Sequence, residues 1–221
     1  MSYLRDRVFI LKTSPFREHD AWVSMYGREH GKLEAVARGT RRWNAKQLGH
    51  LEPLTQADVM IAKGASFDKL AVAHATEAQN GMRQRLGAIV TLGSFAHLVD
   101  QLTRPGLADQ EIFDLLDEFY STWNSTVREP SPERARLLYA AAAVRLLNAL
   151  GYAPSFDRAD VSDEAHKLLQ VLPRTSFAVA ISITAPISVL NEASQSIENV
   201  LRDTPLAEKA HGPVTIVSFL T

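Results

Sequence analysis

Cysteine is absent from this chain of 221 residues. Without thiols the chain has no disulfide bonds, no thiolate ligands for zinc and no cysteine nucleophile. It also lacks an apolar run near the roughly 18 residues that cross a bilayer, and its start does not pair positive charge with an apolar segment as a secretion signal does. These absences predict a cytoplasmic protein without membrane contact.

Motifs that define enzymes by their spacing are missing as well. There is no glycine-rich phosphate loop of the Walker or dinucleotide type and no G-x-S-x-G elbow. The seven histidines are scattered, and no two of them stand at a zinc-binding spacing. Asp114, Asp117 and Glu118 cluster, but the polar face of a helix explains them. We therefore expect no enzyme, no metal and no cofactor, although residues distant in sequence could still combine for acid–base chemistry.

The net charge is only −1, but the charges are distributed unevenly. Residues 1–50 contain ten Lys or Arg against five Asp or Glu, whereas residues 154–221 contain five against eight. This asymmetry predicts a local anion-binding site rather than a wholly basic coat protein. The apolar share of 46% is typical of a packed globular protein, and the length favours two small domains.

The densest group of positive charges lies in residues 28–46, which read REHGKLEAVARGTRRWNAK. Residues 32–38 alternate as a strand does, and the charges then continue into a loop. Guanidinium groups beside an indole suit a polyanion with flat bases, because phosphates neutralise the charge and a base stacks on the ring. The candidate binding residues are Arg28, Lys32, Arg38, Arg41, Arg42, Trp43 and Lys46. The alternative is a solvated basic loop that binds nothing.

Five segments in the first 77 residues have the composition of short strands. They are residues 7–12, 21–26, 32–38, 57–63 and 67–77. Residues 13–20, which contain Pro15, are expected to form a loop between the first two strands. Five short strands with turns between them predict a small closed barrel of the OB type, which binds oligonucleotides on one sheet face and the neighbouring loops.

Side chains on two of the predicted strands carry further expectations. Trp22 and Tyr26 share one face of the second strand, where packing under a loop or a second domain is preferred to base stacking. In the fifth strand Leu70, Val72 and His74 are expected on one side, with His74 as a hydrogen-bonded core residue.

Beyond residues 79–81 the apolar residues follow a helical period. The predicted helices are residues 82–103, 109–122, 131–150, 162–171 and 187–201, while residues 176–183 read as a strand or buried segment and 214–219 as a last strand. Ser131 and Pro132 are a strong helix start, and the apolar surface of the helix that follows predicts a central position in a bundle. The expectation is an α+β protein, with an OB barrel in residues 1–79 and an α-helical bundle domain in residues 80–221.

Short strings in a fixed order resemble the RecO family of bacterial recombination mediators. In the first half they are EHD at 18–20, YGREHGK at 26–32, AVARG at 35–39 followed by Arg41 and Arg42, and LEPL at 51–54. The match runs in order over about residues 8–77, and LGYAP at 150–154 resembles the family's segment after its central helix. No single string is decisive, but the ordered series is specific.

The resemblance implies a protein without catalytic turnover that acts in DNA repair and recombination. Family members bind single- and double-stranded DNA, anneal strands coated by single-stranded DNA-binding protein, and act with RecR to help RecA load. A cytoplasmic, nucleoid-associated location follows. By position, Arg38, Arg41, Arg42 and Lys46 match the family's basic DNA-contact loop, although Trp43 stands where proline is more usual. Many members carry a four-cysteine zinc knuckle after the GYAP segment, and this chain has none.

A protein-interaction adaptor is the alternative function. In that hypothesis the barrel or bundle grips an acidic peptide, such as the C-terminal tail of single-stranded DNA-binding protein. The resemblance implies that the helical domain holds this tail. The candidate arginines are Arg104, Arg134, Arg136 and Arg145.

Overall fold

The computed structural model describes residues 2–40, 48–53, 55–76, 82, 84–126, 129–156 and 161–203. The chain divides into two compact units. The first combines residues 1–79 with residues 103–113, and the second combines residues 80–102 with residues 114–221.

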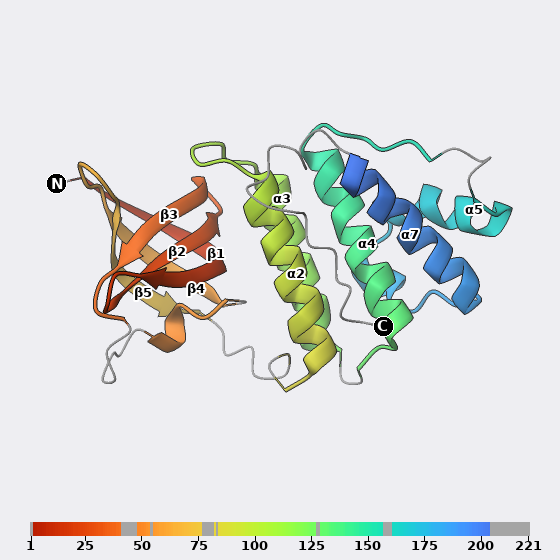
Figure 1. Ribbon diagram of the computed structural model, residues 1–221, viewed down its shortest axis with the longest axis horizontal. Coiled ribbons are helices and arrows are strands. Elements are labelled where there is room, and N and C mark those ends of the chain that lie inside the picture. Colours follow the sequence, from red (N-terminus) through yellow and green to blue (C-terminus); the bar gives the residue numbers. More distant parts are fainter. Residues whose placement is uncertain are drawn as a thin grey trace. The chain divides into compact units, whose positions relative to one another are not determined.

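The first unit is built on a closed five-stranded barrel (Figure 1). Its strands are β1 (Tyr3–Phe16), β2 (Asp20–Gly27), β3 (Gly31–Ala37), β4 (Gln56–Ala62) and β5 (Lys69–Ala75), and a short 3-10 helix, η1 (Leu48–His50), precedes β4. The order around the barrel is β1-β2-β3-β5-β4, with β3 and β5 parallel and the other pairs antiparallel. Together with the helices that follow, this confirms the predicted OB-like barrel and helical region.

Side chains that alternate along the strands fill the barrel. Its buried core consists of Val8, Ile10, Val23, Met25, Leu33, Ala35, Ala37, Leu51, Ala57, Val59, Ile61, Leu70 and Ala73. Successive residues of a strand point to opposite faces, so every second residue points into the barrel. The apolar alternation that predicted β2 and β3 therefore also identifies the side chains that pack in the core.

β1 is longer than predicted, and residues 13–16 belong to it rather than to a loop. Pro15 pairs with Ala21 of β2, whereas β4 pairs only with residues 3–9 of β1. Proline is tolerated in a strand where its missing N–H faces no ladder partner. The turn to β2 is therefore confined to residues 17–19.

The predicted face of β5 was wrong beyond Leu70. The register shifts between Met60 and Ile61 on the partner strand, where Ile61 pairs with Leu70 but Met60 pairs with Val72. This bulge turns Ala73 into the core and leaves Val72 and His74 exposed. The histidine predicted to lie in the core instead stands outside, with its ring 5.6 Å from that of His50.

Residues 103–113 pack on the outer surface of the barrel, and the sequence analysis did not anticipate this. Phe113 contacts Phe9 with ring centroids 5.3 Å apart, and Pro105 forms an isolated bridge with Gly31. The Tyr26 hydroxyl accepts from the Asp109 N–H at 3.2 Å and donates to the Asp109 carbonyl at 3.3 Å. Burial raises the pKa of Tyr26 to about 12, so the phenol stays protonated. Tyr26 therefore packs under the connecting segment of residues 103–113. This is the interpretation that the sequence analysis preferred to base stacking.

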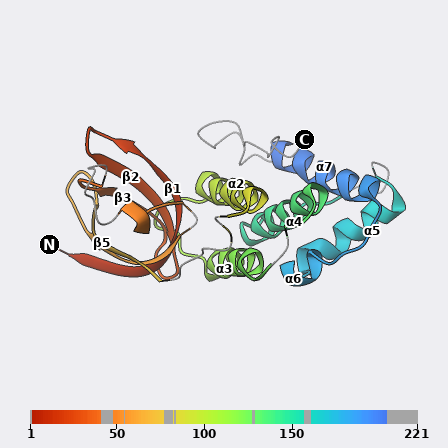
Figure 2. The ribbon, with the colours of Figure 1, turned by 90° about the horizontal axis from the view of Figure 1, so that it is seen from below.

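The second unit is a helical bundle. Its elements are α2 (Leu86–Leu102), α3 (Gln110–Ser125), whose first turn belongs to the first unit, α4 (Pro132–Ala149), α5 (Asp163–Val171), η2 (Leu172–Arg174), α6 (Phe177–Ala180) and α7 (Ile187–Asp203). α4 lies between α2 and α7, and most of its residues are buried (Figures 1 and 2). The predicted central helix is confirmed. Among the described helices, none has the length and apolarity needed to cross a membrane.

Residues 176–183 do not form a strand. The structure has the short helix α6 there, with Phe177 and Ala180 buried beside α4. A run of apolar residues this short does not distinguish a strand from a buried helical turn, so the alternative of a buried segment was the better one. The strand predicted at 214–219 lies outside the described residues.

Glu118 joins three elements of the bundle. Its carboxylate accepts from Arg145 of α4 at 2.7 Å and from the N–H of Phe177 at 3.0 Å, and the Arg145 guanidinium lies 4.5 Å from the Phe177 ring centroid. Burial by itself would raise the pKa of Glu118, but the hydrogen bonds from Arg145 and Phe177 and the charge of Arg145 together lower it below its ordinary value.

Replacing Glu118 with glutamine is expected to lower the unfolding free energy by about 1 kcal/mol at neutral pH, because a third of the side chain remains exposed. The lowered pKa makes the carboxylate stabilising above the pKa it has in the unfolded chain, and this stabilisation is lost as the pH falls through the folded-state value. Urea unfolding of parent and variant at several pH values checks this. A difference that stays constant into the acid range would contradict it.

Candidate nucleic-acid interface

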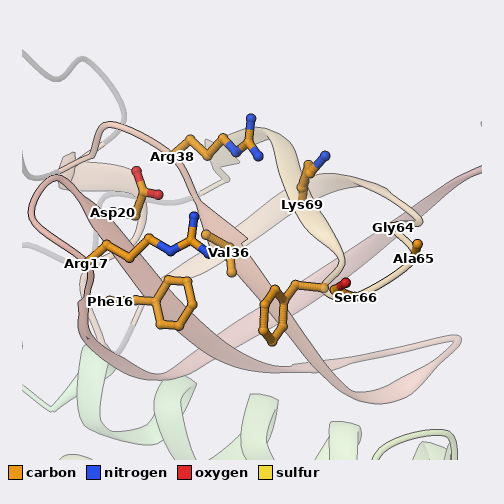
Figure 3. A pocket seen from close by; sticks show the side chains of 10 residues that line it. Phe16, Arg17, Asp20, Val36, Arg38, Gly64, Ala65, Ser66 and Lys69 are labelled. Atoms are coloured by element: carbon orange, nitrogen blue, oxygen red, sulfur yellow. The ribbon is translucent and has the colours of Figure 1, made fainter.

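A hollow of about 310 Å³ opens on one side of the barrel (Figure 3). Three parts of the chain line it: the β1–β2 turn with the strand residues beside it, the end of β3, and the β4–β5 loop with the start of β5. We call this hollow the loop groove. Its lining residues are Phe16, Arg17, Asp20, Val36, Arg38, Gly64, Ala65, Ser66, Phe67 and Lys69. In OB barrels the β1–β2 and β4–β5 loops are the ones that hold oligonucleotides.

Positive charge dominates the loop groove. Arg17, Arg38 and Lys69 contribute three cations around Val36, against one carboxylate from Asp20 (Figure 3). Asp20 accepts a hydrogen bond from the Gly39 N–H at 2.9 Å, which holds the turn after β3. Within the part of the chain that the structure describes, Arg38 and Lys69 form no ion pair. Their charges are therefore available to an anionic ligand.

Three aromatic rings form a cluster at the same place. Phe16, Trp22 and Phe67 lie with their centroids 5.6–5.7 Å apart in each pair. Phe16 also carries the guanidinium of Arg17 over its ring at 5.2 Å. Trp22 and Phe16 are half-buried, whereas Phe67 is 42% exposed. Proteins that bind single-stranded nucleic acid combine cations, which bind the phosphates, with exposed aromatic rings, on which bases stack.

Arg17 has a backbone conformation that arginine rarely adopts. Its φ is +57°, and it is the one non-glycine residue with a positive φ among the residues that the structure describes. A left-handed conformation costs roughly 1–2 kcal/mol for a residue with a side chain. The tight turn over residues 17–19 requires it, and it places the guanidinium beside Phe16 at the groove.

Asp68 links the β4–β5 loop to its surroundings through hydrogen bonds. One carboxylate oxygen accepts from Lys63 at 2.7 Å, the other accepts from the Gly64 N–H at 3.2 Å, and the Asp68 carbonyl accepts from the N–H of Val36 at 2.9 Å. Gly64 leaves no room for a side chain, because a Cβ there would lie 2.0 Å from the Phe67 carbonyl. The loop that carries Phe67 is thus preorganised.

The candidate residues from the sequence are separated by the fold. Arg38 lines the loop groove, whereas Arg28 is exposed elsewhere, with its guanidinium 5.8 Å from the Phe113 ring. Lys32 is only 8% exposed, and its ammonium lies 4.0 Å from Glu34. Arg41, Arg42, Trp43 and Lys46 lie outside the described residues.

Sequence reasoning missed Arg17, Lys69 and Phe67 as groove residues. Each is isolated in sequence, so no run of charges or aromatics marks it. The available signal was positional: Arg17 lies in the predicted loop between the first two strands, and Phe67 and Lys69 lie at the start of the predicted fifth strand, beside the β4–β5 connection. The β1–β2 and β4–β5 connections are the binding loops of an OB barrel.

A second hollow of about 750 Å³ adjoins the first, and Gly64, Ser66 and Phe67 line both. Its basic residues His30, Lys32 and Lys63 are matched by the acidic residues Glu29, Glu34 and Asp68. This balance makes the second hollow a weaker anion site than the loop groove. The described residues include no group of three or more side chains that could hold a metal ion.

Comparison with known proteins gives a family match over the region that contains the barrel. Residues 1–79 match the family described as "Recombination protein O N terminal". The DNA repair protein RecO of Desulfitobacterium hafniense (strain DSM 10664 / DCB-2) is 28% identical over 145 residues, which cover 66% of this chain and 50% of that protein. The DNA repair protein RecO of Cutibacterium acnes is 31% identical over 159 residues, covering 70% and 63%. Residues 1–79 match the RecO N-terminal family, and the chain is similar to RecO proteins over about two thirds of its length.

Identity to another relative is higher over a shorter stretch. The DNA repair protein RecO of Bifidobacterium longum (strain DJO10A) is 41% identical over 78 residues, which cover 35% of this chain and 33% of that protein. The chain spans about half the length of the RecO relatives it matches.

Proposed function

We propose that this chain is a DNA-binding recombination mediator of DNA repair whose loop groove holds single-stranded DNA. The observation that carries the proposal is the convergence of Arg17, Arg38 and Lys69 on one groove, whose walls include the two loops that bind oligonucleotides in OB barrels. Phosphates neutralise these cations, and counterion release supplies sequence-independent affinity. The residues proposed from the sequence as further DNA contacts are Arg28, Lys32, Arg38, Arg41, Arg42, Trp43 and Lys46; of these Arg38 lines the groove, whereas Lys32 is nearly buried beside Glu34. In this proposal residues 1–79 are the DNA-binding domain, on whose barrel residues 103–113 also pack, and the rest of residues 80–221 is the helical domain.

Replacing Arg38 and Lys69 together with alanine should weaken binding of a labelled oligo(dT) about tenfold at roughly 0.1 M salt. The slope of log affinity against log salt should become shallower by about 1.4, because each lost phosphate contact on a single strand removes about 0.7. Fluorescence anisotropy over a salt titration measures both quantities. The same loss should appear on any base sequence, because phosphates carry no sequence information.

Arg5 provides the matched control. It is an exposed arginine on β1 of the same barrel, and it lines a different hollow together with Met60 and Val72. Arg5→Ala should leave the salt slope nearly unchanged. If Arg5→Ala and the double variant weaken binding equally, the groove is not the binding site and only the overall charge acts. Replacing Arg41 and Arg42 with alanine tests the contacts proposed from the sequence in the same assay.

The mediator role is proposed from the resemblance and from the relatives, which are named DNA repair proteins. In this role the protein anneals complementary strands without catalytic turnover, and with RecR it helps load RecA. It contacts single- and double-stranded DNA and the tail of single-stranded DNA-binding protein, and it resides in the cytoplasm at the nucleoid. A strand-annealing assay on oligonucleotides coated with that protein tests the role directly.

The adaptor alternative receives little support from three of the four arginines proposed for it. Arg145 is paired with Glu118 at 2.7 Å, and Arg136 with Glu198 at 3.4 Å. Arg134 lines a hollow with the apolar residues Ile181, Ile187 and Leu190, but Glu129 and Glu133 line it too and would repel an acidic peptide. Anisotropy with a labelled acidic peptide beside the labelled oligonucleotide separates the two functions: peptide binding without DNA binding would establish the adaptor.

A further inference from the structure

Phe67 is the most accessible ring at the loop groove. It is 42% exposed, whereas Phe16 and Trp22 are half-buried and the Arg17 guanidinium already lies over the Phe16 ring. Exposed apolar surface of this kind marks a place where a ligand or partner can bind and remove the ring from water. Phe67 also lines both hollows, so it lies where they adjoin.

We infer that Phe67 is the residue by which the groove distinguishes single-stranded from duplex nucleic acid. This inference rests on the proposed function, because it assumes that the groove binds the sugar-phosphate chain. The ring offers a stacking surface to an unpaired base, while the cations beside it bind the backbone. Base–aromatic stacking tolerates every base, since each base has a π face.

A duplex cannot use the ring in the same way. Its bases are already stacked on one another, so a base reaches Phe67 only after it is unpaired and turned out of the helix, at a cost of a few kcal/mol. The cations Arg17, Arg38 and Lys69 meet phosphates on either kind of DNA. The structure therefore divides the groove into cations that bind both forms and a ring that favours one.

The loop is built to keep the ring in place. Asp68 binds Lys63 and the Gly64 N–H on one side and the β3 backbone on the other, so the backbone that carries the ring is held, and the ring itself packs against Phe16 and Trp22. A preorganised ring loses little conformational entropy on stacking. Asp68 is accordingly a positioning residue, and it acts through Phe67.

The experiment compares Phe67→Ala with the parent on an oligo(dT) of about 20 nucleotides and on a duplex of the same length, by fluorescence anisotropy. Affinity for the single strand should fall about 5- to 100-fold, whereas affinity for the duplex should change less than about twofold. Phe67→Leu should resemble Phe67→Ala, and Phe67→Tyr should resemble the parent, because only tyrosine retains the π face. Quenching of 2-aminopurine placed within the oligonucleotide reports stacking itself and should be lost in the alanine variant.

Tyr152 supplies the matched control, since it is an aromatic residue of the second unit with a similar exposure of 39%. Tyr152→Ala should change neither affinity. If Phe67→Ala weakens single-strand and duplex binding equally, or leaves single-strand binding intact, the inference is overturned while the proposed function stands. If the parent binds neither DNA, the proposed function itself fails. A ring that only packs against Phe16 and Trp22 would lower thermal stability when removed without altering the ratio of the two affinities.

Discussion

Replacing Asp6 with alanine is expected to lower the unfolding free energy of the barrel by about 2–4 kcal/mol. The Asp6 side chain is fully buried, and its carboxylate accepts from the Glu29 N–H at 3.1 Å and from the His30 N–H at 2.9 Å, with His30 Nδ1 3.0 Å away. Alanine would leave these backbone donors of the β2–β3 turn without their acceptor, and each unsatisfied donor costs about 1–3 kcal/mol.

Hydrogen exchange read on peptides of β2 and β3 measures this loss within the barrel alone. Asp58→Ala is the control. Asp58 pairs with Arg7 at 3.0 Å, but both side chains are about half exposed, so its loss should cost at most about 1 kcal/mol. Asp6→Asn should fall between the two, because an amide keeps one acceptor oxygen. Equal effects of the two alanine variants would show that the turn does not depend on the buried carboxylate.

Asp6 shows why the sequence predicted the strands of the barrel but not the groups that connect them. The alternation of apolar and polar residues locates β2, β3 and β4 within a residue or so, because each strand must present one face to the core. A carboxylate on β1 has no pattern that relates it to the turn at residues 28–30. That contact follows from the register Val8↔Gly27, which closure of the sheet determines.

The same distinction applies to the candidate site. Arg38 was predicted because it belongs to a dense run of charges, and the structure places it at the groove. Arg17 and Lys69 are 52 residues apart in the numbering and meet only because β3 pairs with β5 in the closed barrel. Lys32 belongs to the same run as Arg38, yet its side chain is nearly buried beside Glu34. Local charge density therefore identifies a region, and topology decides which of its side chains share a surface.

Replacing Gly31 with alanine is expected to destabilise the barrel by about 3 kcal/mol or more and to release residues 103–109 from its surface. Gly31 has φ +64°, and a Cβ at this position would lie 2.1 Å from the Leu107 carbonyl oxygen. The left-handed conformation alone costs roughly 1–2 kcal/mol for alanine. The clash is with backbone rather than with a flexible side chain, so the segment must move, and its contacts through Pro105 and Asp109 move with it.

Gly106→Ala separates backbone strain from the clash. Gly106 also has a positive φ, +83°, but no atom lies within 4 Å of the position its Cβ would take. Gly106→Ala should therefore lower the unfolding free energy only by the backbone strain and leave residues 103–109 protected from hydrogen exchange. Gly31→Ala should remove that protection. Equal effects of the two variants would mean that close approach at Gly31 is unimportant. If the expected difference is found, residues 103–109 pack on the barrel because Gly31, the first residue of β3, has no side chain. No periodicity in the sequence could reveal this close approach.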